Sequence, residues 1–567
     1  MDLSYKNGKK FIYFILCGFL INLVSGVNPG PQVIATKGAI WPKPQRQNIS
    51  DSYFILKPGK FQFVLSDITK NCGILQSALD RYLKIIQQNE ILTKDTLKYR
   101  KPHDKNKKSW HFREKFLGYL DQLTINLSQT CDDTKYPDLE MDEHYYLVIN
   151  QTTFKLEAAS FWGILRGLES FSQLLYLGDD LLSLRINQTE IVDFPRYKHR
   201  GLLIDTSRHF LPLNVIYKTL DAMSYNKMNV LHWHIVDDQS FPYVSIRFPE
   251  LSNMKCKNYN GGAMLNKINC NFSNLGSFNP YTKTYTPEDI NSIIEYGKVR
   301  GIRIIPEFDT PGHTRSWGVS HPELLTECQE LDTFGPLDPT KAETYSFMNN
   351  LLAEVKVLFK DQFLHLGGDE VDFTCWMGSQ NITEFMKKYN ISSYFALESY
   401  YVQKIVDMTE KLKLNSIVWE EVFHNGVKLP QSTVVQVWKG DWKETIKNVT
   451  ESGYQALLSS CWYLDNIQSG GDWTSFYNCD PSVFNGTENQ QNLVLGGDAC
   501  MWGEVVNEHN LISRVWPRAS APAEKLWSAK NKDPDLDEVA RRLEEHTCRM
   551  NRRNIGAEPP NGPGYCD

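Results

Sequence analysis

The sequence predicts an α/β protein in which a smaller α+β domain precedes a (β/α)8 TIM barrel. Two observations support this fold class. Eight short apolar runs, separated by amphipathic helical stretches or long loops, recur over roughly the last 350 residues, and this alternation favours a barrel over a doubly wound sheet. The chain also has 567 residues, which is more than one hydrophobic core usually supports.

The composition excludes several classes of protein. Hydrophobic residues make up 41% of the chain, which is ordinary for a globular protein and excludes a disordered or collagen-like one. The 61 basic and 67 acidic residues leave a net charge of −6, which argues against a polybasic nucleic-acid-binding protein. We therefore expect no nucleic-acid partner. The 14 tryptophans and 27 tyrosines indicate an aromatic-lined binding site.

The first 26 residues are typical of a signal peptide. A basic lead over 6–10 precedes the apolar run Phe11–Val24, and the small residues after it place cleavage near Gly26. The run has 14 residues, fewer than the ~20 that span a bilayer, although an uncleaved N-terminal anchor is the alternative. No later apolar stretch reaches 18 residues. We expect a protein of the secretory pathway, lysosomal or extracellular, with no stable membrane span.

Twelve cysteines in an exported chain predict disulfides. Cys17 leaves with the signal peptide, and spacing alone does not determine how the others pair. The candidate pairs are Cys72/Cys131, Cys256/Cys270, Cys328/Cys375, Cys461/Cys479 and Cys548/Cys566. Cys500, in the apolar segment Leu493–Trp502, is then expected to be a buried free thiol. A zinc site is the competing interpretation, but the sequence has no CxxC pair and no HExxH helix, so we expect no metal.

Nine Asn-x-Ser/Thr triplets are candidate glycosylation sites. Each triplet is a weak signal alone, but together behind a signal peptide they support passage through the secretory pathway. The acceptors are Asn48, Asn126, Asn150, Asn187, Asn271, Asn381, Asn390, Asn448 and Asn485.

Residues 27–195 are predicted to form the α+β domain and 196–567 the barrel domain, with the boundary at Asp193–Arg196. The first part contains two strand-like runs and one helical pattern, at Tyr53–Val64, Tyr145–Ile149 and Gly73–Gln88. The segment Lys94–Lys115 is dense in basic residues and is predicted to be a solvated loop, with a processing site or a polyanion contact as alternatives.

In the barrel domain, polar, charged or aromatic residues follow each apolar run. The runs are Gly201–Asp205, Val230–Val236, Ile302–Phe308, Phe363–Leu366, Ser416–Trp419, Val434–Trp438, Ala456–Ser459 and Leu493–Leu495. Because the carboxyl ends of barrel strands meet on one face, these residues are expected to form one concave site rich in carboxylates and indoles.

Carboxylates with aromatic rings and no metal motif are suited to the cleavage of glycosides, since sugars offer apolar faces and hydroxyl edges. The most informative segment is Gly367-Gly368-Asp369-Glu370, where two acids are adjacent. Ordinary retaining glycosidases place two carboxyl groups about 5–5.5 Å apart on opposite sides of the scissile bond. Two adjacent residues are poorly placed to flank a sugar in this way. We therefore expect the backbone to bend at the glycines and the substrate to supply the nucleophile.

Several long motifs resemble the β-N-acetylhexosaminidases of glycoside hydrolase family 20, of the eukaryotic lysosomal or secreted type. The motifs are His199–Pro212 (HRGLLIDTSRHFLP), Asn226–Asp238 (NKMNVLHWHIVDD), Glu307–Trp317 (EFDTPGHTRSW), His365–Trp376 (HLGGDEVDFTCW) and Asp498–Glu504 (DACMWGE). The resemblance implies a retaining, substrate-assisted hydrolysis through an oxazolinium intermediate. The substrates would be terminal non-reducing β-linked GlcNAc or GalNAc in glycoconjugates or chitooligosaccharides. The resemblance further implies a homodimer and no cofactor.

The resemblance also implies catalytic roles for three residues. Glu370 would be the general acid, Asp369 would orient the acetamido group, and Tyr463 would donate a hydrogen bond to its oxygen. The indoles are expected to shield the carboxyl of Glu370 from water. The substrate-binding residues implied are Trp419, Trp438 and Trp502 around the acetyl group, Arg208, Glu504 and Asp465 at the hydroxyls, and Asp237 and His313 in support of the acid.

One local departure bears on specificity. Family members that accept acidic substrates resemble Tyr-Leu-Asn-Arg at the loop that reads Tyr463-Leu464-Asp465-Asn466 here, without the arginine and with an added carboxylate. The sequence therefore resembles the type that prefers neutral sugars. The segment Cys256–Cys270 is an insertion relative to that type.

Two further interpretations remain open from the sequence. A carbohydrate-binding protein on an inactive hydrolase scaffold would need the indoles but not the acids, so the joint presence of Glu370, Asp369 and Tyr463 argues against it. The second interpretation is an enzyme specialised for chitin oligomers or for N-glycan trimming. It would have the same sugar-binding site as an enzyme of lysosomal glycan turnover.

Overall fold

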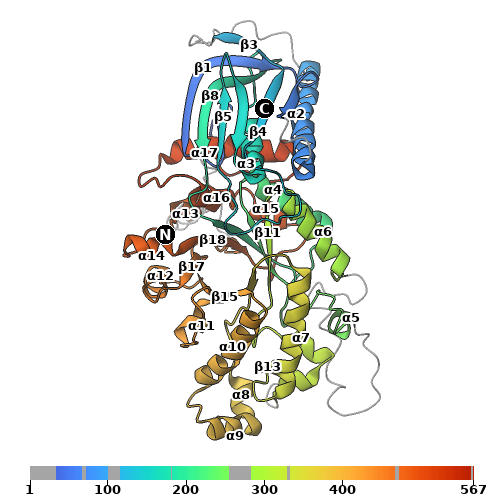
Figure 1. Ribbon diagram of the computed structural model, residues 1–567, viewed down its shortest axis with the longest axis vertical. Helices are drawn as coiled ribbons and strands as arrows, with labels where there is room; N and C mark the ends of the chain where they lie inside the picture. The colour runs from blue at the N-terminus through green and yellow to red at the C-terminus, as the bar shows by residue number, and fades with distance from the viewer. Residues whose placement is uncertain are drawn as a thin grey trace, which may run out of the picture.

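The computed structural model describes residues 33–66, 72–99, 115–180, 182–253, 283–328, 333–466, 471–562 and 566. The predicted signal peptide, the Cys256/Cys270 pair and the acceptor Asn271 lie outside these residues. Within them the chain forms a mixed sheet from its N-terminal part and a closed parallel barrel from the rest (Figure 1).

The N-terminal sheet has eight strands, in the order β2-β4-β6-β5-β8-β1-β3 with β7 paired to β8. Their bounds are β1 Arg46–Leu56, β2 Gln62–Leu65, β3 Phe116–Leu120, β4 Gln122–Leu127, β5 Tyr145–Ile149, β6 Phe154–Ala158, β7 Tyr176–Leu177 and β8 Leu184–Asp193. Helices α2 (Gly73–Tyr99) and α3 (Phe161–Gln173) pack on each other, and α3 contacts β4, β5 and β6. Burying the apolar faces of both helices against the sheet gives this part its own core.

The structure corrects two predictions here. The run Tyr53–Val64 is not one strand: a turn over 58–60, which contains Pro58 and Gly59, separates β1 from β2. Pro and Gly commonly mark such turns. The predicted helix at Gly73–Gln88 continues to Tyr99, so the start of the basic segment Lys94–Lys115 is helical rather than loop, and 100–114 lie outside the described residues.

All eight apolar runs of the barrel domain are strands, and they close in the order β10-β11-β14-β15-β16-β17-β18-β9. Their bounds are β9 His199–Asp205, β10 Val230–His234, β11 Arg303–Glu307, β14 Phe363–His365, β15 Asn415–Trp419, β16 Val434–Val437, β17 Gln455–Leu458 and β18 Val494–Met501. Every pair of neighbouring strands is parallel, which confirms the TIM barrel.

Helices and a small hairpin connect the barrel strands, and three further helices follow the last strand, β18. They are α4 Leu213–Tyr225, α5 Glu250–Asn253, α6 Pro287–Lys298, η4 Arg315–Val319, η5 Pro322–Leu324, β12 Leu325–Cys328, β13 Thr333–Leu337, α7 Ala342–Leu358, α8 Thr374–Gly378, α9 Gln380–Tyr389, α10 Tyr394–Lys411, α11 Glu420–His424, α12 Trp442–Glu451, α13 Trp473–Asn478, α14 Glu488–Asn492, α15 Leu511–Val515, α16 Ser520–Trp527 and α17 Leu536–Arg552. Local capping sets several of these starts; Thr286 and Asp289, for example, form a reciprocal capping box before α6.

Inside the barrel, an apolar layer crosses from wall to wall. One buried residue from each of seven strands builds it: Val230, Ile305, Phe363, Ile417, Val434, Leu457 and Leu495. Because side chains alternate along a strand, the residues two positions further on also point inward, one layer closer to the carboxyl ends. The apolar layer therefore seals the barrel below the level at which polar side chains gather.

Buried ion pairs join the N-terminal sheet to the barrel. Glu143, between β4 and β5, is 3% exposed and binds Arg200 of β9 through two hydrogen bonds of 2.6 and 2.7 Å. The same carboxylate accepts a 2.7 Å hydrogen bond from Arg166 of α3. Burial alone would raise the pKa of Glu143, but the two guanidinium groups hold it below its usual value. The C-terminal helix α17 adds to this junction, since Arg549 donates to Gln173 of α3 (Figure 1).

Four of the predicted disulfides are present: Cys72–Cys131, Cys328–Cys375, Cys461–Cys479 and Cys548–Cys566. Cys500 is a free, buried thiol, as predicted. Of the described glycosylation candidates, Asn48, Asn381, Asn390 and Asn485 are exposed, whereas Asn126, Asn150, Asn187 and Asn448 are half-buried. Among the described residues, no helix has both the length and the hydrophobicity that crossing a bilayer requires.

We expect Glu143→Gln to lower the free energy of unfolding by about 3–5 kcal/mol, because it leaves two buried guanidinium groups without a counter-charge. Chemical denaturation followed by circular dichroism measures this loss. The matched control is Glu140→Gln, which removes an exposed partner of Lys198 and should cost at most about 1 kcal/mol. Equal losses in the two variants would contradict the role given to the buried pair.

Candidate active site

The backbone bends where β14 ends, at the Gly-Gly-Asp-Glu segment. Gly367 and Gly368 have φ of 65° and 93°, and Glu370 has φ of 49°. A Cβ on Gly367 would lie 1.8 Å from an oxygen of Asp309, so only glycine fits there. The bend gives the adjacent acids different surroundings: Asp369 is 8% exposed, whereas the side chain of Glu370 is 59% exposed. The expectation that the indoles shield Glu370 from water is therefore wrong for this structure.

A chain of charged side chains runs beside Glu370. His313 Nε2 lies 3.9 Å from Glu370 Oε2, and His313 Nδ1 lies 3.3 Å from Asp237 Oδ1. Asp237 also pairs with Arg208 at 2.8 Å, and Arg208 lies 3.7 Å from Glu504. Burial alone would lower the pKa of His313, but the carboxylate of Asp237 raises it to about 9. Near neutral pH His313 is therefore a cation that faces the carboxyl of Glu370.

Aromatic rings form the opposite part of the site. Trp419 is buried, and its ring centroid lies 6.4 Å from that of Trp438 and 6.2 Å from that of Trp502. The rings of Trp438 and Tyr463 stack with centroids 6.1 Å apart. Burial raises the pKa of Tyr463 above its usual value, so its hydroxyl keeps a proton to donate. Three half-buried rings over one buried indole make an apolar wall of the kind that packs against sugars.

The loop that carries Tyr463 is held at both ends. Leu464 N–H donates to the Cys500 carbonyl at 2.8 Å, and the Cys461–Cys479 disulfide begins two residues before the tyrosine. Asp465 follows on the same loop, and its buried Oδ1 has no hydrogen-bond partner among the described residues. Burial and the neighbouring charge of Glu504 raise the pKa of Asp465 to about 6. This oxygen is free to accept a hydrogen bond from a bound ligand.

A polar layer lies directly above the apolar layer of the barrel, and Glu307 is at its centre. Its Oε2 contacts His232 at 3.0 Å and His234 at 2.8 Å, and its Oε1 accepts a 2.7 Å hydrogen bond from the indole of Trp419. The other nitrogen of His234 contacts Asp237 at 2.9 Å. Glu307 thus connects the floor of the site to both the indole wall and the charged chain.

Opposite charges alternate through this layer. Although burial alone would lower the pKa of His232, the carboxylate of Glu307 raises it to about 9. Burial likewise opposes the charge of His234, and Glu307 raises its pKa to about 10. His232 Nδ1 contacts Asp498, which binds His199 through its other oxygen at 2.6 Å. Each buried charge in the layer therefore has a partner of the opposite sign, as buried charges require.

Asp309 and Asp369 are a buried pair of acids. A carboxylate oxygen of each acid and a ring nitrogen of His313 all lie within 4.8 Å of one another. The Asp309 carboxylate also accepts a 2.8 Å hydrogen bond from Gly368 N–H. Burial and the charge of Asp369 raise the pKa of Asp309 well above its usual value. Burial raises the pKa of Asp369 to about 6, against the opposing effect of His313. One carboxyl of this pair holds a proton well above the pH at which an isolated carboxyl loses it.

Two clusters at the site gather side chains of types that can bind a metal, His232/Glu307/His365 and Asp309/His313/Asp369. In the first, both nitrogens of His232 already contact carboxylates. In the second, His313 is charged and contacts Asp237. Hydrogen bonding and ion pairing thus account for the side chains of both clusters.

Comparison with known proteins identifies the family. The sequence model of the glycosyl hydrolase family 20 catalytic domain matches residues 197–530, and one described as beta-acetyl hexosaminidase like matches 40–174. The chain belongs to glycosyl hydrolase family 20. It is therefore an enzyme, a glycoside hydrolase of the β-hexosaminidase type.

Relatives of this family match nearly the whole chain. The chain is 43% identical to the beta-hexosaminidase subunit beta of Mus musculus, over 98% of this chain and 97% of that protein. It is 42% identical to the subunit beta of Homo sapiens, over 97% of this chain and 93% of that one. Among solved structures, the chitobiase of Flavobacterium johnsoniae has a TM-score of 0.74 at 27% identity, covering 92% of this chain and 73% of that chain.

The structure brings together the site residues that the sequence predicted for this family 20 enzyme. Asp369 and Asp465 are linked to the other site residues through electrostatic effects. Short distances or ring contacts join the remaining nine, which are Glu370, His313, Asp237, Arg208, Glu504, Trp419, Trp438, Trp502 and Tyr463. Sequence reasoning assigned no role to Glu307 or Asp309. The sequence signal that could have indicated a polar layer inside the barrel was the period-two pattern Val230, His232, His234, which places polar side chains on the inward face of the strand.

The stability of the protein is expected to depend on pH through Asp369. Its pKa of about 6 in the folded state exceeds the usual 3.8, so the folded state binds this proton more tightly than the unfolded state. Raising the pH through about 6 therefore lowers the free energy of unfolding, by about 1.4 kcal/mol for each unit by which the folded pKa exceeds the usual one. We expect Asp369→Asn to reduce the fall in melting temperature between pH 5 and pH 8, as measured by thermal scans.

The matched control for this test is Asp372→Asn. The pKa of Asp372 is lowered from 3.8 by its hydrogen bonds to Thr374, so the carboxyl is ionised in both states above pH 5. The fall in melting temperature between pH 5 and pH 8 should then match that of the unsubstituted protein. If the Asp369 variant also showed an unchanged fall, the buried-acid explanation would be wrong.

Proposed function

We propose that the protein is an exo-acting β-N-acetylhexosaminidase that removes terminal non-reducing β-linked GlcNAc or GalNAc by a retaining, substrate-assisted mechanism. The observation that carries this proposal is the contrast between two adjacent acids, Asp369 buried beside Asp309 and Glu370 exposed beside His313. Both acids lie at the end of the same strand, so they do not flank a scissile bond as an acid and a nucleophile would. The acetamido oxygen of the substrate then takes the place of the protein nucleophile.

In this mechanism Glu370 protonates the glycosidic oxygen while the acetamido oxygen attacks C1. The bond from C1 to the leaving oxygen breaks as the new C1–O bond forms, which produces an oxazolinium ion and releases the alcohol. Water then attacks C1 from the face that the leaving group has vacated and passes a proton to Glu370, so the configuration is retained. His313 Nε2, 3.9 Å from Glu370 Oε2, is close enough to hold this carboxyl in place for both steps.

Asp369 and Tyr463 hold the acetamido group for the attack. The carboxylate of Asp369 accepts the amide N–H and stabilises the positive charge that develops on the ring of the intermediate. The Tyr463 hydroxyl donates to the acetamido oxygen. Its stacking on Trp438 and the disulfide at Cys461 support this placement, while Trp419 and Trp502 complete the apolar wall around the methyl group.

The remaining polar groups are proposed to bind the sugar hydroxyls. Arg208 and Glu504 lie 3.7 Å apart and supply a donor and an acceptor for O3 and O4. Asp465, with its unpartnered Oδ1, accepts a hydrogen bond from O6. Two carboxylates at this edge favour neutral sugars, because a sulfate or a carboxylate on the substrate would be repelled.

The wider biological setting is part of the same proposal. The near full-length similarity to mammalian beta-hexosaminidases supports a secretory route, with a lysosomal or extracellular destination. We propose residues 1–26 as the signal peptide, 27–195 as the N-terminal domain and 196–567 as the catalytic domain. We further propose a homodimer and chitooligosaccharides among the substrates. The N-terminal domain supports the barrel through the Glu143–Arg200 contact.

Glu370→Gln is expected to lower kcat about 100- to 10,000-fold on a β-GlcNAc glycoside with a poor leaving group, because no other side chain replaces the acid. The loss should shrink on a dinitrophenyl glycoside, whose leaving group needs little protonation. Asp369→Asn should instead lose activity on both substrates, since the acetamido attack accompanies the departure of either leaving group. Steady-state kinetics on the two glycosides measures this difference.

A β-glucoside with the same leaving group serves as the substrate control, because it lacks the acetamido nucleophile and should not be turned over. Binding of GlcNAc without any hydrolysis by the unsubstituted protein would identify a carbohydrate-binding protein instead and defeat the proposal.

Asp465→Asn is expected to increase the relative kcat/KM for a 6-sulfated β-GlcNAc glycoside over the unsulfated one. Because the pKa of Asp465 is about 6, the unsubstituted enzyme should discriminate more strongly at pH 7 than at pH 5. In the Asn variant this pH dependence of the ratio should weaken. A ratio that does not change on substitution would show that Asp465 does not face O6.

A further inference from the structure

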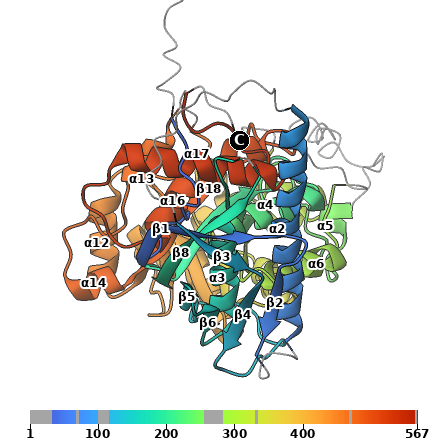
Figure 2. The same cartoon turned by 90° about the horizontal axis from the view of Figure 1, so that it is seen from above.

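A second pocket lies outside the barrel wall and shares no residue with the proposed active site. It has a volume of about 680 Å³, within the range of about 300–1,000 Å³ typical of ligand pockets. Residues of α12, α13, α14 and α16 and of the segment that leads to α17 line it. Figure 2 shows α12, α13 and α14 on the side of the molecule away from α2 and α6.

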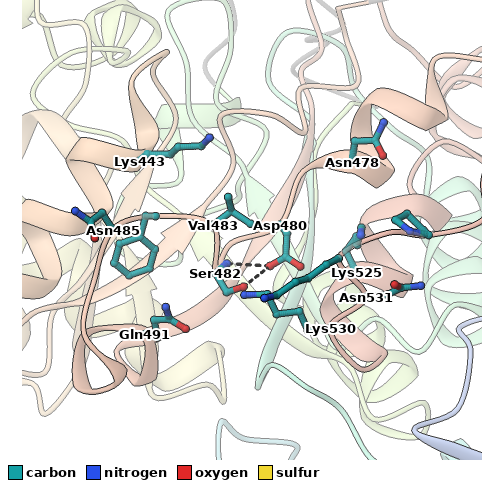
Figure 3. Close-up of a pocket in the computed structure, with 13 residues that line it drawn as sticks. Lys443, Asn478, Asp480, Ser482, Val483, Asn485, Gln491, Lys525, Lys530 and Asn531 are labelled. Carbon is teal, nitrogen blue, oxygen red and sulfur yellow. Dashed lines mark hydrogen bonds between the residues drawn. The ribbon is translucent and has the colours of Figure 1, made fainter.

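Lysines dominate the charged lining of this pocket. Lys443 and Asn485 lie on one side and Lys525 and Lys530 on the other, and Lys532 belongs to the same lining (Figure 3). No hydrogen bond or ion pair involves the amino group of any of these four lysines in the described part of the chain. Four lysines around one pocket stand out in a chain whose net charge is −6.

The acidic residue in the lining offsets these charges only in part. Asp480 accepts two hydrogen bonds from Arg196, of 2.8 and 3.0 Å, and a third from Ser482. The arginine holds the pKa of Asp480 below its usual value, against the opposing effect of burial. Asp480 also attracts the ammonium of Lys525, but one carboxylate that is shared with Arg196 faces four lysines, so the lining keeps a net positive charge.

Lys525 is the buried member of the lysine set. It is 8% exposed, and its amino group lies 4.5 Å from the centroid of the Tyr477 ring. Burial lowers the pKa of Lys525 despite the opposing effect of Asp480 and Glu524, so these two carboxylates compensate its charge only in part. Buried ammonium groups in proteins normally have an anionic partner. The pocket side is where such a partner has room to bind.

We propose that this pocket binds a saccharide that carries a sulfate or phosphate ester. The ammonium groups supply the charge that recognises either oxyanion. The amide side chains of Asn478, Asn531 and Gln491 can hydrogen-bond to sugar hydroxyls, and Phe484 offers an apolar face to the ring. The mixture of point charges, amides and one aromatic ring fits a charged sugar better than a bare inorganic ion. This binding goes beyond the proposed hydrolysis and does not depend on it.

The test compares maltose 6-sulfate, maltose 6-phosphate and maltose as ligands of the intact protein in isothermal titration calorimetry. Maltose lacks the acetamido group, so the proposed active site does not compete for it. We expect the esters to bind at least 10-fold more tightly than maltose, with affinity that falls as salt is added. The two esters distinguish a sulfated from a phosphorylated source.

Lys525→Met keeps the apolar stem over Tyr477 and removes the charge, and it should weaken binding of the preferred ester at least 10-fold. Lys530→Ala with Lys532→Ala tests the exposed lysines should the first variant not fold. The matched control is Lys411→Met, an exposed lysine at the end of α10, which should leave binding unchanged. Turnover of a β-GlcNAc reporter should be the same in all of these variants.

Three results would overturn the proposal. The first is equal affinity for maltose and its esters, and the second is unchanged ester binding in both lysine variants. The third concerns Asn485, the candidate glycosylation site in the lining. If the esters bind only after Asn485→Gln, a glycan of the protein itself covers the pocket and no external saccharide uses it.

Discussion

The site depends on one buried carboxylate, Glu307. Its two oxygens contact His232, His234 and the indole of Trp419, so a single side chain sets the relative positions of groups from three strands. An ionised carboxylate at this depth is stable only because cations and donors surround it. The apolar layer below excludes water from one side, which makes each of these contacts stronger and more directional. The indole wall and the charged chain are therefore parts of one rigid unit.

That unit explains how two adjacent acids come to differ. The chain bends at Gly367 and Gly368, which turns Asp369 inward against Asp309 and leaves Glu370 at the mouth beside His313. Burial raises the pKa of Asp369 to about 6, while Glu370 is exposed beside the cationic His313. These different surroundings suit two different tasks, orientation of the substrate and proton exchange with it.

Much of this could be predicted from the residues in order. The eight apolar runs, each followed by carboxylates or indoles, predict a barrel with its site at the carboxyl ends. The four described disulfides are among the candidate pairs, although spacing alone did not determine the pairing. The turn residues Pro58 and Gly59 are visible in the sequence, but the apolar residues on both sides of them led to the prediction of one continuous strand. The exposure of Glu370 was not predictable, because it depends on the direction of a bend rather than on the residues that allow it.

By itself, the sequence determined the fold class, the family and the identity of the side chains that meet at the site, because periodicity and motif order are local properties. Only the tertiary structure decided which charges touch. The contacts of Glu307 with His232, His234 and Trp419 and the pairing of Asp309 with Asp369 join segments far apart in the chain. Barrel closure and helix packing set those distances, and electrostatic energies depend on distance and burial rather than on sequence spacing.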